Sequence, residues 1–223
     1  MLDDLFAKLF PQSSPAPAGP VEYIVAGLGN PGTEYQATRH NAGYLALDLL
    51  AEKYNVKVSR IRFQSLCGEC VIHGKKVLLL KPTTYMNLSG RAVQEALAFH
   101  KVPMQRLIVL CDDINLAPGR LRIRRSGSDG GQKGLQNIIY LTGSDAFPRV
   151  RIGIGGKPYP NMDMKDWVIG RLSPDEMKEI APALENAVTA VELLVQGKIN
   201  DAMNLFNKAP QPPQDSDPSH QPE

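Results

Sequence analysis

Among the four histidines of the chain, His40 has the setting that proton-transfer catalysis requires. It ends the stretch GNPGTEYQATRH and precedes a predicted helix that begins at Asn41. A helix N-terminus disfavours the imidazolium cation, so we expect a neutral imidazole that can accept a proton. The others lie in a predicted turn, at a helix end and near the C-terminus: His73, His100 and His220. His40 is the candidate general base; the alternative is a histidine that only caps the helix or packs in the core.

A carboxylate usually orients such a base, and the sequence offers Asp112 and Asp113 for that role. Both follow the apolar run 107–111, which predicts a buried strand, and functional groups gather at the carboxyl ends of strands in open α/β sheets. Because side chains alternate along a strand, the two carboxylates should point to opposite faces of the sheet. A metal site and a simple turn, which Ala117-Pro118-Gly119 favours, are the alternatives.

Two short motifs suggest other chemistries, but their context argues against both. A GxGxxG over 27–32 follows a predicted strand, yet Pro31 interrupts it and eight residues, Thr33–His40, separate it from the helix. In a dinucleotide-binding motif the helix begins within the glycines. Cys67 and Cys70 form a lone CxxC inside a predicted strand, which favours incidental cysteines over zinc or redox chemistry. With no serine in a GxSxG context either, the residues support hydrolysis by a histidine-activated water without a metal.

Positive charge concentrates between residues 119 and 151. Seven basic residues stand there against two acidic ones, whereas the whole chain has a net charge of +2. Arg120, Arg122 and Arg124 alternate with apolar residues, and so do Arg149 and Arg151. Period two places each set on one face of a strand. We favour contacts with nucleic-acid phosphates over a merely solvated face.

These candidate groups need an alternating framework of strands and helices to position them. The sequence predicts a single-domain, layered α/β fold with a central mixed sheet flanked by helices and a helical C-terminal region. The predicted strands are 21–27, 63–72, 76–81, 107–112, 121–125 and 150–154. The predicted helices are 41–54, 89–100 and 134–141, with Asn41 and Ser89 as N-caps, and a region from a capping box at Ser173, interrupted near Pro182 and Gly197.

Length and composition bound the possibilities. The 223 residues, 43% of them hydrophobic, suit one domain over 21–208, with a flexible leader and linker (1–20) and a disordered tail (209–223). The leader contains an amphipathic stretch, 2–10, whose simplest interpretation is a frayed end. No run of about 20 apolar residues predicts a membrane helix, and no signal or transit peptide is evident. Three cysteines argue against a disulfide framework, so we expect a cytoplasmic protein.

Four segments together resemble the bacterial-type peptidyl-tRNA hydrolases. They are GLGNPGTEYQATRHNAG, KPTTYMNLSG, DDINLAPGRLRIR and SGSDGGQKGLQNI, and RIGIG and WVIGRLSPDE support them. The resemblance covers 21–208 in order and implies hydrolysis of the ester between a peptide and the 3′ ribose of tRNA, which frees the tRNA for translation. It implies no metal, no cofactor and no membrane; the partner is peptidyl-tRNA, and we expect a monomer.

The resemblance also implies roles for particular residues. His40 matches the family's catalytic base, Asp112 the carboxylate that holds it, and Asn30 the residue that helps to distinguish blocked from free aminoacyl-tRNA. The expected substrate-contacting positions are Tyr35, Tyr85, Met86, Asn87, Gly131 and Lys133. Arg124 and Arg151 match basic positions that clamp a tRNA phosphate.

One departure from the family pattern affects the substrate contacts. The family usually has His-Asn after the double glycine, where this chain has Gln132-Lys133. A charged lysine donates hydrogen bonds but accepts none, so the role of Lys133 stays open. A non-catalytic RNA-binding relative, like the plant chloroplast factors for group II intron splicing, is the main alternative, and a nucleotide-binding oxidoreductase is a second. The presence of Asn30, His40, Asn87 and Asp112 favours an enzyme.

Overall fold

The structure, a computed structural model, describes residues 19–208. The predictions for the leader and the tail concern residues outside this range, apart from residues 19 and 20. Within it, no helix is both long and apolar enough to cross a membrane.

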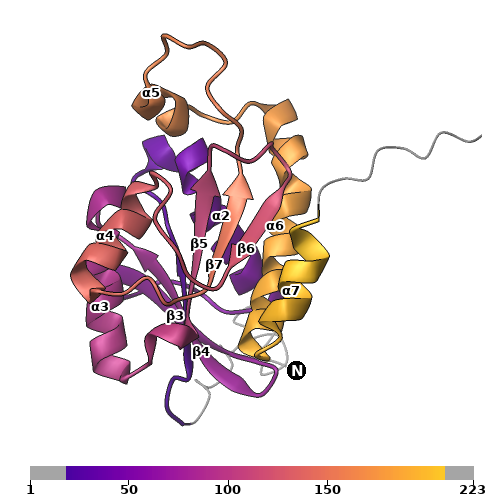
Figure 1. Ribbon diagram of the computed structural model, residues 1–223. Coiled ribbons are helices and arrows are strands. Elements are labelled where there is room, and N and C mark those ends of the chain that lie inside the picture. The colour runs from indigo at the N-terminus through magenta and orange to yellow at the C-terminus, as the bar shows by residue number, and fades with distance from the viewer. Residues whose placement is uncertain (1–18, 209–223) are drawn as a thin grey trace, which may run out of the picture.

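A mixed sheet forms the centre of the molecule, as predicted. It has seven strands, in the order β2-β3-β4-β1-β5-β7-β6 (Figure 1). The parallel strands are β4 (Lys75–Pro82), β1 (Tyr23–Gly27), β5 (Leu107–Asp113) and β7 (Arg149–Gly153). The antiparallel strands are β2 (Arg60–Arg62) and β3 (Ser65–Ile72) on one side and β6 (Leu121–Arg124) on the other. The carboxyl ends of the parallel strands therefore meet at one edge.

Helices cover both faces of the sheet (Figure 1). One layer consists of α2 (Ala42–Lys53), α6 (Pro174–Val195) and α7 (Ile199–Phe206), and the other of α3 (Ser89–His100) and α4 (Lys133–Thr142). A short helix, α5 (Met164–Ile169), lies beyond the carboxyl ends of β5 and β7 (Figure 1). The single-turn 3-10 helices are η1 (Thr33–Tyr35), η2 (Arg39–Asn41), η3 (Met86–Leu88) and η4 (Met104–Arg106).

The buried strands separate two apolar clusters. On β1, Val25 packs with the cluster under α2 and α6, whereas Ile24 and Ala26 pack with the cluster under α3 and α4. A strand buried on both faces is continuously apolar, which explains why 21–27 and 107–111 show no alternation.

Gly27 of the GxGxxG stretch and Gly43 of α2 allow this helix to approach the sheet closely. A Cβ atom on Gly43 of α2 would lie 2.3 Å from the carbonyl oxygen of Leu110, and one on Gly27 would lie 2.5 Å from the carbonyl oxygen of Gly43. Close packing of backbone against backbone thus accounts for these glycines. The contact also brings η2, which precedes α2, against the carboxyl end of β5.

Two local predictions were wrong, and a third was confirmed only in position. Helix α6 continues through Pro182 without interruption, because Ile180, Ala183 and Leu184 around it are buried and packing outweighs the lost hydrogen bond. Ser89 is the first residue of α3 rather than its cap, and its hydroxyl donates to the Met86 carbonyl. Asn41 occupies the N-cap position of α2 but makes no capping hydrogen bond, since its side chain is used elsewhere.

Candidate active site

A cavity of about 830 Å³ opens at the carboxyl edge of the sheet, between η1, η3, the N-terminus of α4 and α5. Every site residue expected from the sequence lines it except Arg124. These residues come from five separate stretches of the chain: Asn30, Tyr35 and His40; Tyr85, Met86 and Asn87; Asp112; Gly131 and Lys133; and Arg151. The fold thus brings together the segments that carry the sequence resemblance.

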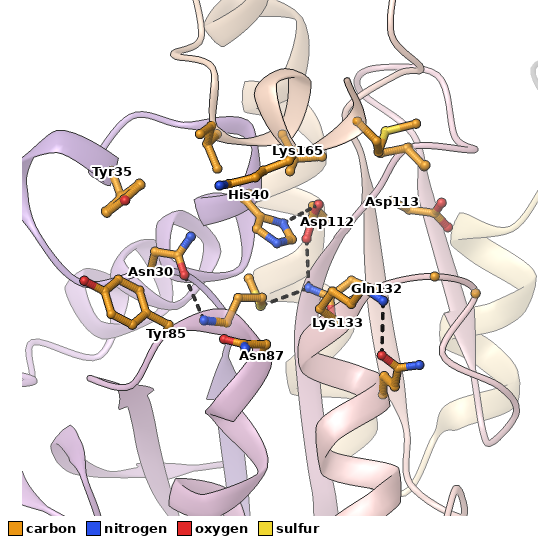
Figure 2. A pocket seen from close by; sticks show the side chains of 18 of the residues that line it. Asn30, Tyr35, His40, Tyr85, Asn87, Asp112, Asp113, Gln132, Lys133 and Lys165 are labelled. Atoms are coloured by element: carbon orange, nitrogen blue, oxygen red, sulfur yellow. Dashed lines mark hydrogen bonds and ion pairs between the residues drawn. The ribbon is translucent and has the colours of Figure 1, made fainter. Parts of the chain in front are cut away.

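His40 and Asp112 form a buried pair at the floor of this cavity (Figure 2). The Nδ1 atom of His40 lies 2.8 Å from Oδ2 of Asp112, and the two residues are 9% and 2% exposed. A carboxylate only accepts hydrogen bonds, so Nδ1 carries the proton and Nε2 is left to accept one. Burial lowers the pKa of His40, but the charge of Asp112 and the hydrogen bond raise it, and the net pKa is above the ordinary value.

This result corrects one part of the sequence interpretation. We expected the N-terminus of α2 to hold the imidazole neutral, but the dominant neighbour of His40 is the Asp112 carboxylate, which stabilises the imidazolium. The two acids do point to opposite faces, as predicted. Asp113 accepts from Nε of Arg151 at 2.7 Å, on the other face of β5.

Gln132 is the second partner of Asp112. Its Nε2 atom lies 3.0 Å from Oδ1 of Asp112 and 3.1 Å from the sulfur of Met86, and its Oε1 accepts from the backbone N–H of Leu135 at 2.7 Å (Figure 2). Gln132 is the N-cap of α4 and is 6% exposed. Sequence reasoning noted this residue only as a departure from the family pattern and did not predict its contact with Asp112.

Asn30 directs an amide donor into the cavity. Its Oδ1 accepts from the backbone N–H of Met86 at 2.8 Å, which leaves Nδ2 as the group that faces the cavity. Its backbone is held by Asn41, whose side-chain oxygen accepts from the Asn30 N–H at 2.8 Å and whose Nδ2 donates to the Asn30 carbonyl at 3.0 Å. The Asn41 side chain therefore fixes the loop that carries Asn30 instead of capping α2.

The rim of the cavity is much more exposed than its floor. Tyr85 is 60% exposed, and Asn87 and Lys133 are also exposed. Figure 2 shows Tyr35 and Tyr85 on one side and Lys165 of α5 above His40. The Lys133 ammonium is directed to Oε1 of Gln136, 3.3 Å away, on its own helix.

The predicted basic face divides into buried and exposed arginines. Arg149 is fully buried and donates to the carbonyls of Phe147, Asp145 and Gly127, so it supports the loop before α4. Arg151 is 7% exposed and paired with Asp113, although it still lines the cavity. Arg122 and Arg124 on β6 are exposed and lie across from Arg151 and Arg149. The alternation was predicted correctly, but the two β7 arginines are largely structural.

Helix α5 and its anchor were missed by the sequence analysis. Met164, Lys165, Val168 and Ile169 of α5 line the cavity. Arg39, next to the candidate base, stacks on Trp167 with its guanidinium carbon 3.7 Å from the ring centroid and pairs with Glu176. The single tryptophan, in a stretch that carries the resemblance, was the available signal.

The CxxC stretch does not form a site. Cys67 packs in the cluster under α3 and α4, and Cys70 in the cluster under α2 and α6, so the two thiols lie on opposite faces of β3. They cannot bind one metal ion together.

Comparisons with known proteins show which family this chain resembles. The model of the peptidyl-tRNA hydrolase family matches residues 24–214. A peptidyl-tRNA hydrolase of Caldanaerobacter subterraneus subsp. tengcongensis is 51% identical over 185 residues, which are 83% of this chain and 99% of that protein. One of Agathobacter rectalis is 46% identical over 186 residues, 83% of this chain and 100% of that protein.

Solved structures show the same similarity. The crystal structure of peptidyl-tRNA hydrolase from Acinetobacter baumannii superposes with a TM-score of 0.77 at 35% identity, over 82% of this chain and 93% of that chain. A structure of a peptidyl-tRNA hydrolase with N-propanol gives a TM-score of 0.78 over the same shares. The fold of the described residues is therefore that of these enzymes.

Proposed function

The chain belongs to the peptidyl-tRNA hydrolase family and hydrolyses the ester bond of peptidyl-tRNA, and we propose that His40 is the base for this reaction. The observation that carries the proposal is the buried His40–Asp112 pair, with Nε2 of the imidazole available in the cavity. Asp112 holds the ring in the tautomer that accepts a proton at Nε2 and stabilises the imidazolium that forms.

The proposed reaction uses one water molecule and forms no covalent bond between the enzyme and the substrate. His40 Nε2 takes a proton from the water as its oxygen attacks the ester carbonyl carbon. The tetrahedral intermediate then collapses, the bond to the ribose oxygen breaks, and the imidazolium returns the proton to that leaving oxygen. A positioned base typically contributes about 10²–10⁴-fold to such a step.

We assign the stabilisation of the developing oxyanion to side-chain amides. Asn30 Nδ2 is pre-oriented because its own Oδ1 is occupied by the Met86 N–H. The Asn87 amide lies at the rim of the same cavity and supplies a second donor. A donor already in place lowers the barrier without reorganisation during the reaction.

The substrate is held, in this proposal, by contacts that do not depend on the peptide sequence. Tyr35, Tyr85, Met86, Gly131 and Lys133 line the path for the 3′ adenosine and the peptide backbone. The exposed Arg124 contacts a tRNA phosphate, and Arg151 offers a second contact from the cavity edge. Because Arg124 lies outside the cavity lining, its contribution to tRNA affinity should be separable from turnover.

The state in which the enzyme acts is also part of the proposal. All groups assigned here come from one chain, which supports a functional monomer. Translation supplies the substrate, which supports a cytoplasmic location. The proposed chemistry uses only His40, Asp112, amides and water, so we expect it to need no metal and no cofactor.

The decisive experiment measures release of labelled blocked amino acid from N-acetylated aminoacyl-tRNA, with unblocked aminoacyl-tRNA in parallel. We expect release from the blocked substrate alone, unaffected by EDTA and lost in His40→Ala. His73→Asn is the matched control, since His73 lies in a hairpin turn at φ 47°, a conformation that asparagine tolerates. Undiminished release by His40→Ala would refute the base assignment, and bound but intact substrate in the wild type would indicate a non-catalytic relative.

A further inference from the structure

The Asp112 carboxylate has two partners, and the second one has no role in the chemistry described so far. Oδ2 accepts from His40 and Oδ1 accepts from Gln132. Both contacts are buried, and Gln132 comes from α4, an element that contributes nothing to the His40–Asp112 pair itself. A carboxylate held at one oxygen can rotate, whereas one held at both oxygens is fixed in its plane.

Every polar group of the Gln132 side chain is engaged. Oε1 accepts from the Leu135 N–H and thereby determines which end of the amide is the oxygen. The two protons on Nε2 then point to Asp112 Oδ1 and to the Met86 sulfur. With all three contacts made, the amide has a single orientation, and one of its N–H groups is directed at Asp112.

We propose that Gln132 is a positioning residue: it fixes the plane of the Asp112 carboxylate and, through Asp112, the direction in which His40 Nε2 points. The inference rests on the proposed function of His40 and Asp112. The same side chain also caps α4 and connects the first turn of this helix to Asp112 at the end of β5 and to Met86 of η3.

The contact also affects the proton affinity of the base. A neutral donor on Oδ1 disperses part of the carboxylate charge, so the pull of Asp112 on the His40 proton is weaker than it would otherwise be. The charged groups around the pair are Asp113 and Arg151, which pair with each other, Lys133 and Lys165 at the rim, and Arg39 of η2, which pairs with Glu176. None of these changes when Gln132 is replaced by another neutral residue.

Variants of Gln132 can distinguish its role as the N-cap of α4 from its role in positioning Asp112. Gln132→Asn keeps a neutral side chain and a favoured N-cap residue, but it is one methylene shorter and cannot reach Asp112. Gln132→His places a ring nitrogen at the same number of bonds from Cα as Nε2 of glutamine and so restores a donor. Gln105→Asn is the matched control, on exposed η4 at the opposite end of β5.

We expect Gln132→Asn to lower kcat about tenfold with KM within about twofold, because a hydrogen bond to a charged group is lost and the base is misoriented. The acid limb of its kcat/KM profile should move to higher pH, while its melting temperature stays close to that of the wild type. Gln132→His should recover most of kcat at pH 8, and Gln105→Asn should match the wild type.

Three outcomes would overturn the inference. The first is a Gln132→Asn variant with the kcat and the pH profile of the wild type. The second is a Gln132→Asn variant in which only KM changes. The third is a Gln132→His variant whose kcat is no higher than that of Gln132→Asn. Failure of the underlying function is distinguishable, because in that case the wild type or the His40→Ala control would already depart from expectation.

Discussion

Polar side chains are buried and hydrogen-bonded at the floor of the cavity, whereas on strand β6 they are exposed. At the floor, His40, Asp112 and Gln132 are almost completely buried, and each has defined hydrogen-bond partners. On β6, the side chains of Arg122 and Arg124 are exposed, and neither takes part in an ion pair among residues 19–208. Proton transfer needs pre-placed groups, whereas attraction to a phosphodiester needs accessible charge.

The two regions should therefore fail in different ways when they are changed. Substitutions at the floor should reduce turnover and leave the affinity for tRNA unchanged. Substitutions on β6 should weaken the affinity for tRNA and leave turnover unchanged. The predictions for His40 and Arg124 test that separation directly, and the others examine the neighbouring residues.

The largest effect is expected for His40→Ala. Loss of the base should lower kcat by about 10³-fold, within the usual range for general-base catalysis. The affinity for tRNA, measured by filter binding, should change less than twofold because His40 is not a phosphate contact. A parallel loss of tRNA affinity would contradict the separation of the floor from β6.

The adjacent acids should give different defects. Asp112→Asn should lower kcat about 10²-fold, because the amide no longer stabilises the imidazolium. Asp113→Asn should instead destabilise the fold by about 3 kcal/mol, since it leaves the Arg151 guanidinium buried without its partner. Steady-state kinetics and urea unfolding of both variants would distinguish these outcomes; equal kinetic defects would refute the division of roles.

The pH profile should report the raised pKa of His40. The base is active when neutral, so kcat/KM should fall about tenfold per pH unit below that pKa, which lies above the ordinary histidine value. In Asp112→Asn the attraction that raises the pKa is gone and burial remains, so the acid limb should move to lower pH. A limb at unchanged pH would mean that another group is titrating.

A smaller effect is expected for Arg124→Ala. Removal of one phosphate contact should weaken tRNA binding several-fold and reduce the slope of log affinity against log salt by about 1. The kcat at saturating substrate should not change. Arg106→Ala, which removes an exposed charge from η4 at the other end of the sheet, is the control and should bind like the wild type.

The smallest effect is expected for Lys133→Asn, which introduces the residue more usual in the family. The Lys133 ammonium points to Gln136, away from the His40–Asp112 pair, so kcat/KM should change by no more than about twofold. A tenfold gain would assign a substrate contact to the asparagine that this chain lacks.

The sequence predicted the sheet, its layers and ten of the residues that line the cavity, but none of the lining residues of α5. Those predictions depend on apolar runs, on alternation and on ordered motifs, which are local signals. Helix α5 and strand β2 were missed because each is a short element without a clear period. The Gln132–Asp112 contact joins residues 20 apart in the sequence and depends on the register of α4 against β5, which no local pattern encodes.

Side chains used in tertiary contacts caused most of the local errors. Asn41 is a residue type that often caps a helix, but its side-chain amide instead forms two hydrogen bonds with the Asn30 backbone. Arg151 has the pattern of a surface arginine, but a buried carboxylate lies within its reach on the neighbouring strand. Local sequence preference indicates which contacts a side chain could make, and tertiary packing determines which of them it makes.

The turn that carries His40 is held by a part of the chain made much later. The Arg39 side chain bonds to the carbonyl of Arg171 and to Glu176, which are 132 and 137 residues away, and Leu172 N–H bonds to the Ala37 carbonyl. Contacts this distant form late in folding. During its own synthesis the chain is itself a peptide esterified to tRNA, and the turn lacks these contacts of Arg39 and Ala37 until Glu176 has left the ribosome. The nascent enzyme thus completes its active site only when most of its own translation is over.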